Sequence, residues 1–339
     1  MSKKTITHVY SGVVLYSLMQ YIFLMDIDTI ENHTYFFFSH AIDKNVAKKF
    51  KHYTQFKDTT KMNPLYRVLY KLKIRFTQYH KYPFLRNANL YAQDHMFGML
   101  LRNRNYSLLE DGPNFLSNSM GKSGYILKLQ KERQHKLSSK IEEWLYGPVT
   151  IKFFGNNKYC SDIYLTEENT STVLEGKRVH VKSLEDMWQE STDEKKDYIL
   201  NKFNVFTEDI IVLSKRSIAF MTQPLVDDGI LTNDEYKSLL QKVFSKYNTH
   251  KMVIKTHPRD KFAYKKYFPE IEVFDKPIGM QLLALAGVHF ERFVTLFSSS
   301  VSGLPYKAEI DYFGTQVHPK LFNYYGDIEP KFPCNLLIS

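Results

Sequence analysis

Residues 252–260 read MVIKTHPRD, an apolar run that turns abruptly into polar and basic residues. This pattern predicts a buried strand that ends near Lys255 and places His257 at its carboxyl end. Pro258 forces an extended or turning backbone there, which fixes the direction of the imidazole. Lys255, His257 and Arg259 can then present cationic or hydrogen-bonding groups to a phosphate. The alternative is a histidine that only caps a loop.

A second apolar run ends in hydroxyl groups. Residues 294–300 read VTLFSSS, so a predicted strand leads into Ser298, Ser299 and Ser300. Backbone N–H groups and hydroxyls in such a turn are donors for an anion. Serines are also ordinary helix N-caps, and the sequence leaves both roles open.

A third run, in the first half of the chain, ends in acids. Residues 106–112 read YSLLEDG, with Glu110 and Asp111 directly after a predicted strand. A carboxylate within hydrogen-bonding range of an attacking hydroxyl can accept its proton, so either residue is a candidate general base. A turn with solvated carboxylates is the alternative.

Short apolar runs alternate with helix-length amphipathic stretches along the whole chain, which predicts an α/β fold with parallel sheets. A polar stretch at residues 183–206 indicates a connection between two lobes, at residues 1–190 and 207–339. Ligands of such sheets bind at the carboxyl ends of the strands. The strands expected in the first lobe cover residues 6–10, 35–39, 89–92, 106–110, 149–154 and 163–166, with helices after Gly12 and over residues 131–145. Those in the second cover residues 210–213, 218–222, 252–255, 272–274 and 293–297, with a helix over residues 234–247.

The composition is that of a globular protein with a basic balance. The 339 residues carry 46 Lys and Arg against 36 Asp and Glu, a net charge of +10 that favours an anionic partner. Cys160 and Cys334 lie far apart, which argues against a disulfide scaffold or a zinc site. The apolar run at residues 13–25 is too short to cross a bilayer, and no signal peptide is visible. We therefore expect a cytoplasmic protein, with peripheral attachment to the inner face of the membrane left open.

Together the three strand ends resemble those of bacterial sialyltransferases, specifically glycosyltransferase family 52 (lipooligosaccharide sialyltransferases) and the related family 38 (polysialyltransferases). Those families share an acidic-acidic-glycine motif in the first lobe, a His-Pro motif in the second, and serines beyond it. Here the motifs are Glu110-Asp111-Gly112, His257-Pro258 and Ser298-Ser299, in that order. Residues 7–12 and 222–225 also look familial, so the resemblance spans most of the chain.

The resemblance implies a GT-B fold, with two Rossmann-like lobes whose parallel sheets face a central cleft. It implies inverting transfer of sialic acid from CMP-sialic acid to a glycan hydroxyl, with no cofactor and no obligatory metal. Glu110 or Asp111 would remove the acceptor proton, and His257 would donate to the leaving phosphate. The residues we assign to donor binding are Lys255, Pro258, Ser298, Ser299, Ser300 and Gly12.

The acidic assignment has rivals. Asp227-Asp228-Gly229 fits the same acidic-acidic-glycine pattern, and in family 52 a catalytic aspartate precedes the histidine. Asp228 and Asp234 are therefore candidates as well. We favour Asp111, which would face the phosphate site from the opposite lobe, with Asp228 second.

Three other patterns carry less weight. Asp26-Ile27-Asp28 matches a metal-binding Asp-x-Asp, but its place after the first apolar helix favours a helix terminus. His318-Pro319 repeats the His-Pro pair without a preceding apolar strand. The basic and aromatic residues 48–53 favour a solvated face over nucleic-acid binding.

We therefore expect a sialyltransferase acting on a surface glycan such as lipooligosaccharide or capsule. Its partners would be a nucleotide-sugar donor and a glycan acceptor, and not nucleic acid. The nearest rival is a hexosyltransferase or polyol-phosphate transferase with another nucleotide donor, since strand-His-Pro motifs also occur in teichoic acid polymerases. A noncatalytic glycan- or nucleic-acid-binding protein is the rival from a different class.

Overall fold

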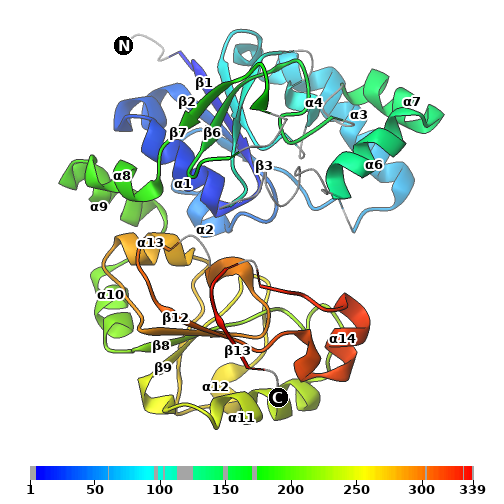
Figure 1. Ribbon diagram of the computed structural model, residues 1–339. Helices are drawn as coiled ribbons and strands as arrows, with labels where there is room; N and C mark the ends of the chain where they lie inside the picture. Colours follow the sequence, from blue (N-terminus) through cyan, green and yellow to red (C-terminus); the bar gives the residue numbers. More distant parts are fainter. Residues whose placement is uncertain are drawn as a thin grey trace. The chain divides into compact units, whose positions relative to one another are not determined.

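A computed structural model describes residues 5–59, 61–94, 98–101, 104–112, 125–147, 152–169, 174–301, 304–330 and 332–337. The chain divides into two compact units, Met1–Lys202 and Phe203–Ser339. Each unit is built on its own parallel sheet with helices around it (Figure 1).

The sheet of the first unit has seven strands in the order β3-β2-β1-β4-β5-β6-β7. Every neighbouring pair is parallel. The chain runs outward from β1 in one direction and then from β4 in the other, so the strand order reverses between β1 and β4. This reversal is the position where open α/β sheets bind ligands. The strands are β1 (His8–Gly12), β2 (Thr34–Phe38), β3 (Tyr53–Gln55), β4 (Asn89–Ala92), β5 (Tyr106–Leu109), β6 (Cys160–Leu165) and β7 (Arg178–Val181).

Helices cover the first sheet because its central strands are apolar on both faces. In β2 the side chains of Phe36, Phe37 and Phe38 are fully buried. Helices α1 and α8 lie on one side of the sheet, and α3, α6 and α7 lie on the other (Figure 1). The helices are α1 (Leu15–Leu24), α2 (Lys44–Ala47), α3 (Pro64–Lys81), α4 (Gly98–Leu101), α6 (Tyr125–Gln134), α7 (Leu137–Tyr146), α8 (Leu184–Gln189) and α9 (Asp193–Lys202).

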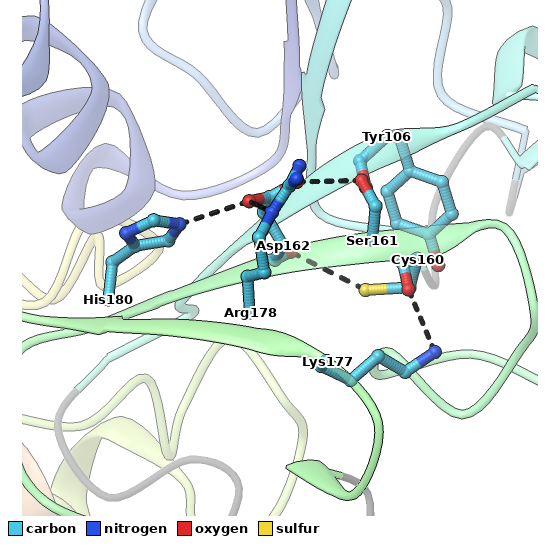
Figure 2. A network of polar contacts seen from close by, with 7 residues as sticks. All are labelled: Tyr106, Cys160, Ser161, Asp162, Lys177, Arg178 and His180. Atoms are coloured by element: carbon cyan, nitrogen blue, oxygen red, sulfur yellow. Dashed lines mark hydrogen bonds and ion pairs between the residues drawn. The ribbon is translucent and has the colours of Figure 1, made fainter.

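The edge strand β7 was not expected from the sequence, and a polar network holds it in place (Figure 2). The Asp162 carboxylate on β6 accepts hydrogen bonds from Arg178 at 2.8 Å and from His180 at 3.0 Å, both on β7. The Arg178 hydrogen bonds hold the pKa of Asp162 well below its usual range. Lys177 donates to the Cys160 carbonyl at 2.8 Å. Because all four residues of β7 are exposed, these side-chain contacts add to the backbone pairing with β6 in holding the strand.

The sheet of the second unit has six parallel strands in the order β10-β9-β8-β11-β12-β13, with the reversal between β8 and β11. The strands are β8 (Ile218–Met221), β9 (Met252–Lys255), β10 (Glu272–Phe274), β11 (Arg292–Thr295), β12 (Glu309–Tyr312) and β13 (Asn335–Leu336). The helices are α10 (Thr207–Ser214), α11 (Asn233–Phe244), α12 (Tyr264–Tyr267), α13 (Met280–Leu285) and α14 (Pro319–Tyr325). Two short α/β units with parallel sheets confirm the predicted fold class.

Most predicted strands are present within a residue or two of their expected bounds, but two predictions need correction. Residues 210–213 form part of helix α10 rather than a strand. Asp209 accepts a hydrogen bond from the Phe206 backbone N–H at 2.9 Å, which caps the helix, and Ile211 is 51% exposed. A central strand would bury that side chain, so the apolar run is the half-covered face of a helix.

The expected strand over residues 149–154 is the second correction. Residues 149–151 lie outside the described part of the chain, and residues 152–154 are not in a strand. Phe154 has a positive φ of 56°, and its N–H donates to the buried Asp94 carboxylate at 2.6 Å. A left-handed residue anchored to a side chain is a turn, not a strand.

The stretch at residues 183–206, expected as a connection, is largely helical. Helices α8 and α9 occupy most of it, and the first unit ends at Lys202. Leu184 and Met187 of α8 are buried, and α8 packs against α1. Among the helices that the structure describes, none has the length and apolarity needed to span a membrane.

Candidate active site

A glutamine that the sequence reasoning missed organises the reversal point of the first sheet. Gln93 follows β4, and its Oε1 accepts hydrogen bonds from the N–H groups of Val13 at 2.6 Å and Val14 at 3.2 Å. Its Nε2 donates to Oδ1 of Asp111, which follows β5. Asp111 is thereby held at the place where this fold binds ligands. A polar residue directly after the predicted strand at residues 89–92 was the signal that could have found Gln93.

The environment of Asp111 suits a general base. The pKa of Asp111 is raised to about 7, because burial and the nearby Asp94 carboxylate raise it by more than the hydrogen bond from Gln93 lowers it. The residue is nevertheless only partly buried. A base works best when its pKa lies near the working pH, because it is then both deprotonated and basic enough to take a proton.

Glu110 occupies a different position from its neighbour. It is only 3% exposed, and its Oε2 accepts hydrogen bonds from the Thr166 N–H at 2.8 Å and hydroxyl at 2.6 Å. Its own N–H donates to Gln20 Oε1 on α1 at 3.0 Å. Burial raises the pKa of Glu110 to about 8. These contacts tie β5 to β6 and α1, so Glu110 holds the turn that presents Asp111.

Gly12, assigned to donor binding, has a packing reason as well. A Cβ at this position would overlap the hydroxyl of Tyr10. That side chain is fully buried and is hydrogen-bonded to Ser17 at 2.8 Å. The end of β1 therefore requires glycine to accommodate the tyrosine ring, and donor binding by Gly12 stays a prediction.

In the second unit, His257 lies just beyond β9 and is fixed by two hydrogen bonds. Its backbone N–H donates to Thr222 Oγ1 at 2.9 Å, which ties it to the end of β8. Its Nδ1 accepts from the Arg259 N–H at 3.1 Å. In the neutral ring the proton must then sit on Nε2, which becomes the donor. Burial lowers the pKa of His257, and the Arg259 and Lys255 charges lower it further, so the neutral ring is favoured.

The turn at Asp227, Asp228 and Gly229 braces the loop that follows His257. Asp228 forms a two-pronged ion pair with Arg259, at 2.8 Å and 3.3 Å. Asp227 accepts from the Lys261 N–H at 2.8 Å. Gly229 has a φ of +72°, a left-handed conformation that favours glycine. Asp228 therefore has a cation as its direct partner, whereas the hydrogen bond described above for Asp111 comes from an amide.

Two residues predicted to bind the donor, Lys255 and Pro258, differ in their exposure. Lys255 is 4% exposed, and its ammonium donates to the backbone carbonyls of Thr256 and Lys276, each at 3.0 Å. Burial lowers the pKa of Lys255 to about 8. Pro258 is exposed in the turn. Phosphate binding by either residue stays a prediction, and for Lys255 it would require the ammonium to leave its carbonyl partners.

The serine turn follows β11, on the other side of β8 from His257. The Ser298 N–H donates to Thr295 Oγ1 at 2.9 Å, and its hydroxyl lies 2.7 Å from that of the exposed Ser300. The Ser299 backbone begins a short 3-10 helix at residues 299–301. At this reversal point Gln223, after β8, accepts from the Phe297 N–H at 3.4 Å. The sheet order thus places the serine turn and the histidine loop on either side of the end of β8.

The remaining candidates have local structural roles. Asp26 accepts from the Thr29 N–H and hydroxyl, each at 2.7 Å, at a helical turn after α1. Asp234 is exposed in the first turn of α11, where a negative charge favours a helix. His318 caps α14 through its Nδ1, which accepts from the Lys320 N–H at 3.2 Å. Within the described residues no cluster of His, Cys, Asp and Glu could hold a metal ion.

Known proteins match both the sequence and the fold. The sequence signature of glycosyltransferase family 52 matches residues 19–321. An uncharacterized protein of Haemophilus influenzae is 33% identical over 248 residues, covering 72% of this chain and 74% of its own length.

Two solved structures share the fold at low sequence identity. A 2,6-sialyltransferase of Photobacterium sp. JT-ISH-224, solved with CMP and lactose, has a TM-score of 0.59 and 11% identity over 90% of this chain and 71% of its own. The GT-B domain of a Photobacterium damselae sialyltransferase has a TM-score of 0.53 and 15% identity over 90% of this chain and 91% of its own. These likenesses identify the two Rossmann-like units as a GT-B fold. With the signature spanning most of its length, the chain belongs to glycosyltransferase family 52.

Proposed function

We propose that this enzyme transfers sialic acid from CMP-sialic acid to a hydroxyl of a cell-surface glycan such as lipooligosaccharide or capsule, with inversion and without a metal. The observation that carries the proposal is a pair of preorganised groups, one after a strand of each sheet: Asp111 after β5 and His257 after β9. One is a carboxyl whose pKa is raised to about 7, and the other is a histidine whose Nδ1 is already occupied. A carboxylate base and an N–H donor are what glycosyl transfer with a phosphate leaving group requires.

In the proposed reaction Asp111 accepts the proton of the acceptor hydroxyl as its oxygen attacks the anomeric carbon. The bond from that carbon to the CMP phosphate breaks, and its electron pair stays on the phosphate oxygen. His257 Nε2–H donates a hydrogen bond to the phosphate as its negative charge grows. Ser298, Ser299 and Ser300 supply further donors on the far side of the β8 end. Because CMP leaves with one phosphate group and not with a diphosphate, side-chain donors are sufficient to stabilise the added charge in this proposal.

Support for this donor comes from the family and from the fold. The Photobacterium 2,6-sialyltransferase was solved with CMP and lactose, and it shares the fold over most of this chain. By analogy, we assign the nucleotide to the second unit and the acceptor to the edge that carries Asp111. The basic balance of the chain suits a donor that carries both a phosphate and a carboxylate.

The test is incubation of the full chain with CMP-sialic acid and lactose, with CMP release and the sialylated product both measured. We expect product formation that persists in EDTA, and no product from UDP-hexoses or CDP-polyols. CMP release without acceptor measures hydrolysis of the donor and is subtracted. Turnover with a UDP-hexose or a CDP-polyol instead would assign the enzyme to another donor. A complete loss of activity in EDTA that magnesium restores would overturn metal independence. Asp26 and Asp28 would then again be candidate metal ligands.

A further inference from the structure

Helix α3 carries an apolar stripe on its outer surface, which none of the described residues covers. Leu65, Val68, Leu69 and Phe76 follow one another at intervals of three, one and seven residues, which places them on one face of an α-helix. Leu65 is 70% exposed and Phe76 is 71% exposed. An amphipathic helix of a globular domain normally turns this face toward the core. The stripe of α3 is turned outward instead.

Helix α7 carries a second stripe and packs against α3. Leu137, Ile141 and Trp144 lie at intervals of four and three residues, and Trp144 is 73% exposed. Arg75 of α3 donates to the Trp144 backbone carbonyl at 3.2 Å, so the two helices are joined directly. Both helices lie on the same side of the first sheet (Figure 1). We name the seven exposed side chains of the two stripes the apolar patch.

Most charged residues of α3 and α7 are positive, although α7 also carries Glu142 and Glu143 beside its stripe. Helix α3 contains no Asp or Glu, but it contains five Lys and Arg residues: Arg67, Lys71, Lys73, Arg75 and Lys81. A cavity of about 490 Å³ between α3 and β3 is lined by Lys57, Lys73 and Lys81 together with apolar and uncharged polar side chains, and by no acid. Exposed Leu, Phe and Trp side chains beside Lys and Arg are the composition that binds anionic membrane surfaces. A second copy of this chain fits less well, because a symmetric contact would bring two basic helices together.

We infer that the apolar patch docks on an anionic phospholipid surface. Leu, Phe and Trp side chains would enter the interface, while Lys57, Lys73 and Lys81 would lie at the level of the lipid phosphates. The affinity has two contributions, the burial of apolar area and the attraction between lysines and anionic headgroups. The docking itself does not depend on the proposed sialyl transfer. If that function holds, the surface would keep the enzyme where glycolipid acceptors reside.

The test is co-sedimentation of the full chain with vesicles of phosphatidylglycerol and phosphatidylethanolamine, compared with phosphatidylcholine alone. Because no glycan or nucleotide is present, failure here is separate from failure of the transferase proposal. We expect binding to the anionic vesicles that weakens at high salt, since surface electrostatics are screened. Replacing Leu65, Leu69, Phe76 and Trp144 together by Gln should lower the partition coefficient by about tenfold or more.

Two variants make the result specific. A triple variant of Lys57, Lys73 and Lys81 to Gln should remove the preference for anionic over neutral vesicles. The matched control replaces exposed apolar residues of helices in the second unit, Ile211, Val212 and Phe322, by Gln, and should bind as the parent does. Thermal unfolding of every variant establishes that it is folded. Absence of vesicle binding by the parent, or unchanged binding by the four-residue variant, overturns the inference. A dimer that the same variant dissociates, without vesicle binding, would assign the patch to a second copy.

Discussion

Two turns of this chain read acid-acid-glycine, one in each unit, and their carboxyl groups have different surroundings. At Glu110-Asp111-Gly112 the first acid is buried beside a threonine and the second is partly buried beside an amide, and burial raises the pKa of both carboxyls. At Asp227-Asp228-Gly229 the acids pair with the Arg259 guanidinium and the Lys261 N–H. A carboxylate paired with a cation is a weaker proton acceptor than one held by an amide in a buried site. The same three letters therefore give a candidate base in one unit and a brace in the other.

The largest effect that we expect is that of Asp111→Asn. The amide keeps the shape of the side chain but accepts no proton, so kcat should fall by about 10²- to 10⁴-fold while CMP binding stays nearly unchanged. Steady-state kinetics and calorimetric titration with CMP measure the two quantities. Glu110→Gln is the control within the same turn, and it should cost less because Glu110 is already committed to Thr166. A collapse of kcat in Glu110→Gln with an active Asp111→Asn would exchange their roles.

The next effect is that of His257→Ala, which tests what the second turn braces. Loss of the Nε2–H donor should lower kcat on the order of a hundredfold, because the leaving phosphate loses a preorganised partner. The measurement is CMP release at saturating donor, with circular dichroism to establish folding. A folded His257→Ala protein with near-normal turnover would remove the histidine from the chemistry.

The pH profile sharpens the comparison through Gln93. Asp111 must be deprotonated to act, and its pKa is raised to about 7, so kcat/KM should rise with pH through that region. The Gln93 hydrogen bond lowers this pKa, so Gln93→Met should move the acidic limb of the profile to higher pH. Gln223→Met changes the corresponding glutamine of the second sheet and should leave that limb in place. A merely structural role of Gln93 would lower the plateau without moving the limb.

The smallest effect should come from Asp228→Asn. Its ion pair with Arg259 involves a guanidinium side chain that is 65% exposed, and exposed pairs contribute about 0–1 kcal/mol. A brace of that size predicts a loss in kcat/KM of less than about fivefold. Abolished turnover in Asp228→Asn, with active first-unit variants, would place the base in the second unit and make Glu110-Asp111-Gly112 a turn that positions the acceptor.

The pattern of apolar residues was sufficient to predict most strands, because an apolar run indicates a buried segment. Residues 252–254 are all apolar, and they are buried together with Lys255 in an interior strand of a parallel sheet. The prediction failed where a strand and a helix give the same apolar pattern. The apolar run at residues 210–213 fits a strand and a half-covered helix equally, and only the Asp209 cap and the exposure of Ile211 distinguish them. Strand β7 was missed because its residues are exposed, and the Asp162 contacts that help to hold it come from another strand.

The sequence by itself determined the α/β class, the strand ends that carry the acids, the histidine and the serines, and the family resemblance. These features are local, since a strand and the residues after it are adjacent in the chain. Only the tertiary structure decided which carboxyl is buried, which is paired, and which glutamine holds it. Gln93 and Asp111 are 18 residues apart, and Asp228 and Arg259 are 31 apart. Because a pKa depends on neighbours in space, two turns with the same pattern could not be told apart until the chain was folded.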